Sequence, residues 1–251
     1  MTRIILRGCL GRMGQEITRL VKEDAVAQIV AGVAEAADAN SAYPVFEKFA
    51  DCNIEADVII DFSSPLRINE MLAYAIDHKL PIVLCTTGLS EEDINRVNET
   101  SKLVPILRSA NMSLGVNTVM QLLKLAAKSL ASADFDIEIV EKHHNQKVDA
   151  PSGTALALAD CMNEVLDERY DYTFDRSQVR EKRSKKEIGI SAVRGGTMVG
   201  EHEVIFAGLD EVIEIKHTAY SRAIFAKGAI QAAKFLKDKT PGMYQMGDLI
   251  V

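Results

Sequence analysis

The stretch RIILRGCLGRMGQEITRLVKE, residues 3–23, joins an apolar run to an amphipathic run through a turn that contains three glycines. The apolar, β-branched run predicts a strand, and the helical spacing after it predicts a helix. Gly8, Gly11 and Gly14 allow a tight turn and a close approach to a pyrophosphate, whose phosphates the helix N-terminal N–H groups can hold. The stretch therefore predicts the start of a dinucleotide-binding fold, although its G-x-x-G-x-x-G spacing also fits an ordinary strand-to-helix turn.

The alternation of strands and helices continues to residue 113. The strands are nearly continuous apolar runs, which are typical of a parallel sheet covered by helices on both faces. The predicted fold class is therefore α/β, with a Rossmann-type doubly wound parallel sheet. Further strands are expected over residues 27–35, 56–63, 80–88 and 104–113, and helices over 65–79 and 90–102, the latter with Ser90 as its N-cap.

The pattern changes after residue 113. Long helical stretches now stand beside strands that alternate between apolar and polar residues, so one face of their sheet should be wet. This part predicts a second α+β domain with an open mixed sheet. Helices are expected over 115–131, 152–168 and 224–239, and strands over 135–144, 187–196 and 202–220, the last broken by a Gly-Leu-Asp-Glu turn.

Composition bounds the possible partners. The chain has 251 residues, of which 47% are hydrophobic, and a net charge of −7, so it has no electrostatic reason to bind nucleic acid or an anionic membrane. No leader and no long apolar run is evident, and the four cysteines are widely spaced, which fits reduced thiols better than disulfides or a zinc site. We expect a soluble cytoplasmic protein without a metal.

Three positions after predicted strands are candidates for binding the dinucleotide. Glu35 ends the second strand, where a carboxylate could bind the ribose hydroxyls, although a plain surface acid would look the same. The polar segments CTTG (85–88) and SANMS (109–113) each close a later predicted strand of the same sheet, and ligands bind beyond the carboxyl ends of such strands. Short polar loops end most strands, so these two are candidates because of their position relative to the glycine turn.

The stretch EKHHNQKVDAPSGTA, residues 141–155, carries a different chemistry. His143 and His144 end a strand and should point to opposite faces, so they should not share a metal. Histidine can give a proton near neutral pH, and Lys147 could lower its pKa or donate a proton itself. The N–H groups of Ser152, Gly153 and Thr154 begin a helix and could hold a carboxylate.

Either histidine alone could be an ordinary histidine at a strand end, but the two histidines, the lysine and the helix start within twelve residues favour an active site. A second basic segment, VRGGTMVGEHEV, contains Arg194, Gly195, Gly196 and His202. It could face the same cleft, and an ordinary hairpin explains it equally well.

Taken together, these motifs resemble the 4-hydroxy-tetrahydrodipicolinate reductase family. GCLGRMG, DVIIDFSSP, CTTG, SANMSLGVN, EKHHNQKVDAPSGTA, RGGTMVGEHEV and FAKGAIQAAKFL occur in the order of that family, and HHNQKVDAPSGTA is highly specific. The resemblance implies a dinucleotide-binding domain over 1–113, completed by 224–251. It also implies a substrate-binding and oligomerisation domain over 114–223, a homotetramer, and reduction of a cyclic dicarboxylate by NADH or NADPH.

The resemblance also implies roles for individual residues. His143 would be the proton donor, and Lys147 a proton donor or carboxylate partner. His144, Ser152, Gly153 and Thr154 would bind substrate. The implied cofactor-binding residues are Gly8, Cys9, Leu10, Gly11, Arg12, Met13, Glu35, Cys85, Thr86, Thr87, Ser109, Ala110, Asn111 and Met112.

This chain departs from the family pattern at two positions. Many relatives place an arginine after the ribose-binding acid, where it can bind a 2′-phosphate, but here Ala36 follows Glu35 and Arg12 is the one cation expected nearby. Relatives often have glycine where this chain has Cys85. Because Glu35 has no adjacent arginine and Arg12 could bind a 2′-phosphate instead, we expect use of both NADH and NADPH. Another oxidoreductase, such as a homoserine or aspartate dehydrogenase, or a non-catalytic dinucleotide sensor would share the glycine turn without a reason to keep His143 and Lys147.

Overall fold

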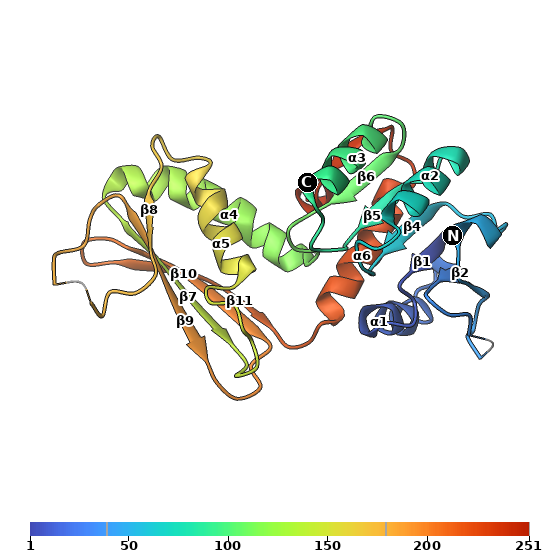
Figure 1. Cartoon of the computed structure of the whole chain (residues 1–251). Helices are drawn as coiled ribbons and strands as arrows, with labels where there is room; N and C mark the ends of the chain where they lie inside the picture. Colours follow the sequence, from blue (N-terminus) through green and yellow to red (C-terminus); the bar gives the residue numbers. More distant parts are fainter. Residues whose placement is uncertain (39, 179, 251) are drawn as a thin grey trace. The chain divides into compact units, whose positions relative to one another are not determined.

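The computed structural model describes residues 1–38, 40–178 and 180–250 of the chain (Figure 1). These residues form two compact units. The first comprises Met1–Leu114 and Ala223–Val251, and the second comprises Gly115–Arg222. The chain therefore leaves the first unit once and returns to it with its last helix.

The first unit is a Rossmann-type domain, which confirms the predicted α/β class. Its seven strands pair in parallel in the order β12-β6-β5-β4-β1-β2-β3. Helices α1 and α6 pack on one face of the sheet, and α2 and α3 on the other. The strands are β1 (Thr2–Arg7), β2 (Ala27–Val33), β3 (Val45–Phe46), β4 (Val58–Asp61), β5 (Ile82–Leu84), β6 (Pro105–Arg108) and β12 (Gly242–Tyr244); the helices are α1 (Arg12–Val21), α2 (Ile68–His78), α3 (Glu91–Ser101) and α6 (Ala223–Leu236).

Helix α6 belongs to the first unit because of close backbone packing. A Cβ built on Gly228 would lie 1.7 Å from the carbonyl oxygen of Met112, so only glycine lets the helix approach the loop after β6. Lys234 of the same helix pairs with Asp24, which follows α1. Helix α6 thus packs directly against the loop SANMS, residues 109–113.

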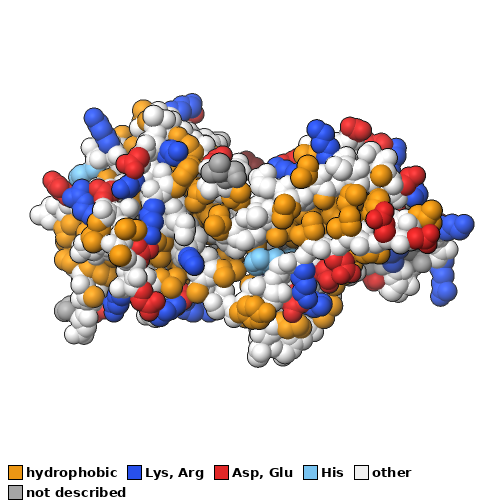
Figure 2. Space-filling model, turned by 180° about the vertical axis from the view of Figure 1, so that it is seen from behind, with side chains coloured by type: hydrophobic (Ala, Val, Ile, Leu, Met, Phe, Trp, Pro, Cys, Tyr) orange, Lys and Arg blue, Asp and Glu red, His pale blue; other side chains and the backbone are white. Residues whose placement is uncertain are grey.

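The second unit is a mixed five-stranded sheet with helices on one face. The order is β11-β10-β7-β9-β8, and α4 and α5 pack on one face through a separate apolar core. On the other face the side chains of β7 are half-buried and alternate with buried ones, as the sequence predicts for a wet face. Figure 2 shows hydrophobic side chains among charged ones on the surface of this unit. Its elements are α4 (Leu114–Leu130), β7 (Asp136–His143), α5 (Gly153–Asn163), β8 (Asp171–Thr173), β9 (Glu187–Arg194), β10 (Gly200–Ala207) and β11 (Val212–Ala219).

Several element ends differ from the predicted ends. Helix α2 begins at Ile68 instead of residue 65, because Arg67 before it has a left-handed φ of 63°. The strand ends at residues 85–88 and 109–113 are loops instead. Ser90 caps α3 as predicted, and its side chain accepts a hydrogen bond from the Asp93 N–H.

Candidate active site

The glycine turn forms one wall of a cavity of about 430 Å³ in the first unit. Gly8 has a φ of +79°, and its N–H donates to the Val33 carbonyl at 2.8 Å. A Cβ built on Gly8 would lie 2.4 Å from the Phe62 carbonyl oxygen, and one built on Gly14 would lie 2.3 Å from the Gly8 carbonyl oxygen. The turn therefore has the close backbone approaches that a dinucleotide cradle requires, and these residues fit such a cofactor.

Four of the predicted cofactor residues line this cavity: Gly8, Leu10, Gly11 and Glu35. Ala36 also lines it, directly after Glu35, and both of these residues are exposed. Arg12 is exposed at the start of α1 and is not among the described residues that line the cavity. The cation that the sequence placed near the adenosine site is therefore not on the cavity wall.

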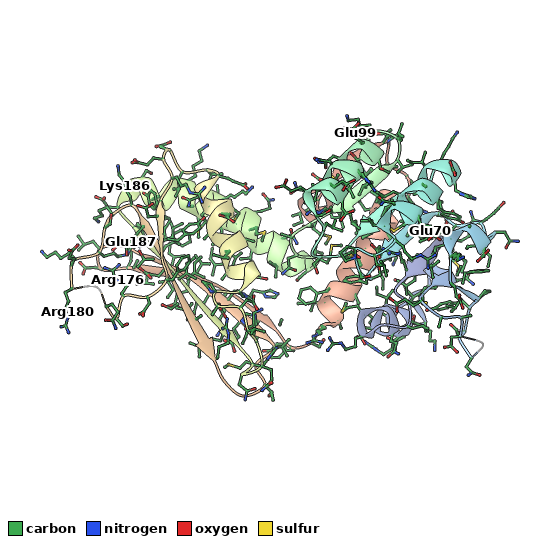
Figure 3. All side chains as sticks on the ribbon, in the orientation of Figure 1. Glu70, Glu99, Arg176, Arg180, Lys186 and Glu187 are labelled. Carbon is green, nitrogen blue, oxygen red and sulfur yellow. The ribbon has the colours of Figure 1, made fainter. Side chains whose placement is uncertain are left out.

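Two arginines that the sequence analysis did not single out do line the cavity. Arg7 ends β1, and its Nη1 donates to the two carboxylate oxygens of Asp61 at 3.1 and 3.2 Å. Arg67 donates from Nε to Oε2 of Glu70 at 2.8 Å, on helix α2 (Figure 3). Each guanidinium is thus already paired with a carboxylate. Glu35 and Glu47 add further negative charge to the wall.

The loop after β5 is tied to the same buried aspartate. Thr86 donates from Oγ1 to Oδ2 of Asp61 at 2.7 Å, so its hydroxyl points into the domain. The Cys85 N–H donates to the Asp61 carbonyl at 2.9 Å, and burial raises the pKa of the Cys85 thiol, with Asp61 adding to the shift. Thr87 is exposed. All four cysteines of the chain are free thiols.

The remaining predicted cofactor residues differ in burial. Cys9 is buried in the turn, and burial raises the pKa of its thiol to about 11. Met112 is buried in the core beneath α6, and Asn111 accepts a hydrogen bond from the Ser113 N–H at 2.8 Å. The other positions of this group lie at the surface or half-buried: Met13, Ser109 and Ala110.

In the second unit, strand register gathers a polar cluster at the end of an apolar sheet face. Ile139 pairs with Val204 in the core, and two residues further along β7, Glu141 pairs with His202 of β10. His143 pairs with Arg194 of the neighbouring β9. Because residues two apart on a strand share a face, Glu141 and His143 continue the buried face on which the core lies.

Glu141 is the centre of this cluster. Its side chain is fully buried and accepts four hydrogen bonds: from Nδ1 of His143 at 2.6 Å, from Nη1 and Nη2 of Arg194 at 2.7 and 2.6 Å, and from the Ser152 N–H at 2.9 Å. Burial by itself would raise the pKa of Glu141, but these hydrogen bonds outweigh it and leave the pKa below its ordinary value. Glu141 is therefore a buried carboxylate that orients the His143 ring.

The other nitrogen of His143 has space that a glycine provides. A Cβ built on Gly200 would lie 3.1 Å from Nε2 of His143, so glycine leaves that nitrogen uncovered on this side. The ring of His202 meets the ring of His143 edge-on, with centroids 5.1 Å apart. Burial, with the nearby His143, lowers the pKa of His202 to about 4, and its Nε2 lies 2.9 Å from Oγ of Ser152. His202 is accordingly a neutral buried partner of the helix cap.

The start of α5 uses some of the N–H groups predicted to hold a ligand. The Ser152 N–H donates to Glu141, and the Ser152 side chain caps the helix through the Ala155 N–H at 3.1 Å. Gly153 is exposed and Thr154 half-buried. Lys147 lies beside this helix start and pairs with Asp149, and His144 is half-buried beyond the end of β7. Ser152, Gly153 and Thr154 therefore form this helix start, and Lys147 is linked to it through Asp149.

Glu141 is the central residue of this cluster, and the sequence analysis did not single it out. A usable signal existed, because Glu141 precedes His143 by two positions on an alternating strand and so shares its face. The involvement of Arg194 could not be read in this way, since it comes from a neighbouring strand. Over residues 1–38, 40–178 and 180–250, no group of three or more histidine, cysteine or acidic side chains could hold a metal ion. Over the same residues, no helix is long and apolar enough to cross a membrane.

Comparison with known proteins gives matches over the whole chain. Residues 2–112 match the family described as "Dihydrodipicolinate reductase, N-terminus", and residues 115–250 match "Dihydrodipicolinate reductase, C-terminus". The chain is 52% identical over 246 residues to the 4-hydroxy-tetrahydrodipicolinate reductase of Clostridium tetani, with 98% of this chain and 96% of the relative covered.

A second relative and a solved structure agree. The 4-hydroxy-tetrahydrodipicolinate reductase of Caldanaerobacter subterraneus is 52% identical over 253 residues, with 100% of this chain and 98% of the relative covered. The solved structure of dipicolinate-bound dihydrodipicolinate reductase from Paenisporosarcina sp. TG-14 has the same fold, with a TM-score of 0.84, 23% identity and full coverage of both chains.

Proposed function

Because this chain belongs to the dihydrodipicolinate reductase family, we propose that it reduces 4-hydroxy-tetrahydrodipicolinate to tetrahydrodipicolinate in the diaminopimelate route to lysine. The observation that carries the proposal is the buried pair of Glu141 and His143, which lies beside the start of α5 in a chain that matches the family throughout. A pair of this kind places a proton donor next to a carboxylate-binding group.

The first unit binds the dinucleotide, and the second binds the substrate. When bound, the nicotinamide supplies the hydride. The N–H groups of Arg12 and Met13 at the start of α1 bind the pyrophosphate, and Glu35 binds the ribose hydroxyls. The Gly8 and Gly11 N–H groups donate to the Val33 and Gly8 carbonyls and hold the turn in shape. The loops at Cys85–Thr87 and Ser109–Met112 support the nicotinamide half. We expect NADH and NADPH both to be used. Glu35 repels a 2′-phosphate and the cavity arginines are already paired, which favours NADH, whereas Arg12 at the exposed start of α1 is the cation that allows NADPH to bind.

His143 supplies the proton. Its Nδ1 is held by Glu141, so Nε2 is the nitrogen that can face the substrate, and the carboxylate stabilises the protonated ring. Arg194 keeps Glu141 ionised and oriented through two short hydrogen bonds. Lys147, His144, Gly153 and Thr154 bind the substrate's carboxylates, with Ser152 holding the helix start in place.

We further propose a cytoplasmic homotetramer in which the open faces of the second-unit sheets pack together. Val193 and Val212 are 44% and 57% exposed on this face in a single chain, and burial of such side chains against another copy is favourable. Light scattering of the purified protein tests the assembly. A monomer at assay concentration would contradict it.

The activity is tested with purified protein, substrate generated by the preceding synthase, and either NADH or NADPH. We expect turnover with both cofactors, kcat/KM for NADH no more than about tenfold below that for NADPH, and no turnover of homoserine. His143→Gln should lower kcat by about 10²- to 10⁴-fold, with NADH affinity unchanged. Turnover of homoserine alone would indicate another dehydrogenase, and NADH binding without any turnover would indicate a sensor.

A further inference from the structure

Lys147 is already bound to a carboxylate of the chain itself. Its Nζ donates to Oδ1 and Oδ2 of Asp149 at 2.7 and 2.9 Å. These hydrogen bonds lower the pKa of Asp149, and the Gly153 N–H contributes in the same direction. The ionised Asp149 carboxylate therefore binds the Lys147 ammonium and the Gly153 N–H, the same two donors that we assign to a substrate carboxylate.

The backbone at Asp149 is fixed independently of its side chain. Arg194 donates from Nη2 to the Asp149 carbonyl at 2.6 Å, while the same guanidinium holds Glu141. The Lys147 N–H donates to the His144 carbonyl at 3.1 Å. The Asp149 side chain is 56% exposed, so it can rotate into solvent while the loop stays in place.

We propose that Asp149 is a built-in competitor for the substrate: its carboxylate occupies the substrate-carboxylate position in the free enzyme and leaves when the substrate binds. The inference rests on the proposed function, since it takes Lys147 and Gly153 as substrate-binding groups. Two carboxylates cannot share these donors without like-charge repulsion. The reaction product is also a dicarboxylate, so the return of Asp149 to Lys147 promotes product release.

The direct test is Asp149→Asn, which keeps the shape and removes the charge. Dipicolinate is the probe, and its dissociation constant is measured by calorimetry on the full-length protein without cofactor. We expect binding to tighten by about two- to fivefold, as is typical of releasing a partly exposed ion pair. Weaker or unchanged binding would overturn the proposal and would indicate that Asp149 orients Lys147 productively.

A matched control separates this effect from a general change in charge. Glu168 pairs with Lys186 at 2.5 Å in the same unit, and both side chains are more than half exposed. Figure 3 labels Lys186. Glu168→Gln removes the same charge and should leave dipicolinate binding unchanged. An equal tightening in both variants would attribute the gain to net charge and overturn the proposal.

A measurement on the wild-type protein does not depend on any variant folding. The carboxyl carbon of Asp149, followed by NMR as a function of pH, should give a depressed pKa in the free enzyme that rises toward the ordinary value when dipicolinate saturates the site. If dipicolinate binds and the pKa stays depressed, Asp149 is not displaced and the proposal fails while the reductase activity stands. If the wild type neither binds dipicolinate nor reduces the synthase product, the proposed function is wrong, and the inference about Asp149 is wrong with it.

Discussion

Glu141→Gln should impair His143, the proposed proton donor, without removing its side chain. The substitution keeps the size of a fully buried side chain, but the amide has one acceptor oxygen and one nitrogen that donates, whereas Glu141 accepts from His143, Ser152 and twice from Arg194. The amide nitrogen must then face a donor. The protonated form of His143 also loses the carboxylate that stabilises it.

The size of the effect can be worked from these contacts. Hydrogen bonds with a charged partner contribute about 1.5–3 kcal/mol, against about 0.5–1.5 kcal/mol for neutral ones, and part of the set is lost outright. We therefore expect the free energy of unfolding to fall by about 3 kcal/mol. This value is near the lower end of the range for breaking a buried ion pair, because the Arg194 side chain keeps some contact with solvent that offsets the loss of its partner. Loss of the charged partner should lower kcat by about 10²-fold or more, which is about 2.7 kcal/mol.

The assay follows NADH oxidation with synthase-generated substrate across pH, alongside urea unfolding. Glu138→Gln is the matched control, because Glu138 lies on the same strand but on its wet face, where it accepts a hydrogen bond from Nε of Arg183 at 2.8 Å. Its kcat should stay within about twofold of wild type, as for other partly exposed pairs. If Glu141→Gln kept full kcat, the assignment of Glu141 as the positioning residue of His143 would be wrong.

Three further predictions concern stability and cofactor choice. Burial and the nearby His143 lower the pKa of His202 from 6.5 to about 4, so between these pH values the unfolded chain binds a proton that the folded chain does not. The free energy of unfolding should therefore fall by roughly 3 kcal/mol as the pH drops from 6.5 to 4. In urea titrations, His202→Gln should remove this part of the pH dependence. Gly14→Ala places a Cβ 2.3 Å from the Gly8 carbonyl oxygen and should lower the free energy of unfolding by about 1–3 kcal/mol, measured by calorimetry. A Cβ on Gly153 would have nothing within 4 Å, so Gly153→Ala should change that free energy by less than about 0.5 kcal/mol. Equal losses in the two variants would contradict the packing argument. Ala36→Arg should raise the ratio of NADPH to NADH affinity by about tenfold in fluorescence titrations, because a guanidinium there can pair with the 2′-phosphate, and an unmoved ratio would place that phosphate elsewhere.

Local sequence determined much of this protein, because its signals act over a few residues. The apolar runs, the helical spacing and the glycines at positions 8, 11 and 14 are enough to predict a parallel sheet with a tight first turn. Ser90 before three acidic residues predicts a capped helix, which the structure contains. The family followed from motifs in a fixed order, and the comparisons confirm it. Helix α2 begins later than predicted because Arg67 adopts a left-handed conformation, which the neighbouring residues do not predict.

Only the tertiary structure decided which side chains share a hydrogen bond across strands. Arg194 reaches Glu141 over 53 positions of sequence because β7 and β9 pair in parallel in one register, and a shift by one residue would turn Arg194 to the other face. Arg7 likewise meets Asp61 across two paired strand ends, which places a paired guanidinium in the wall of the cofactor cavity. Alternation along a strand fixes the face of each side chain, but the partner on that face depends on strand order and register, and these are settled by the packing of the whole sheet.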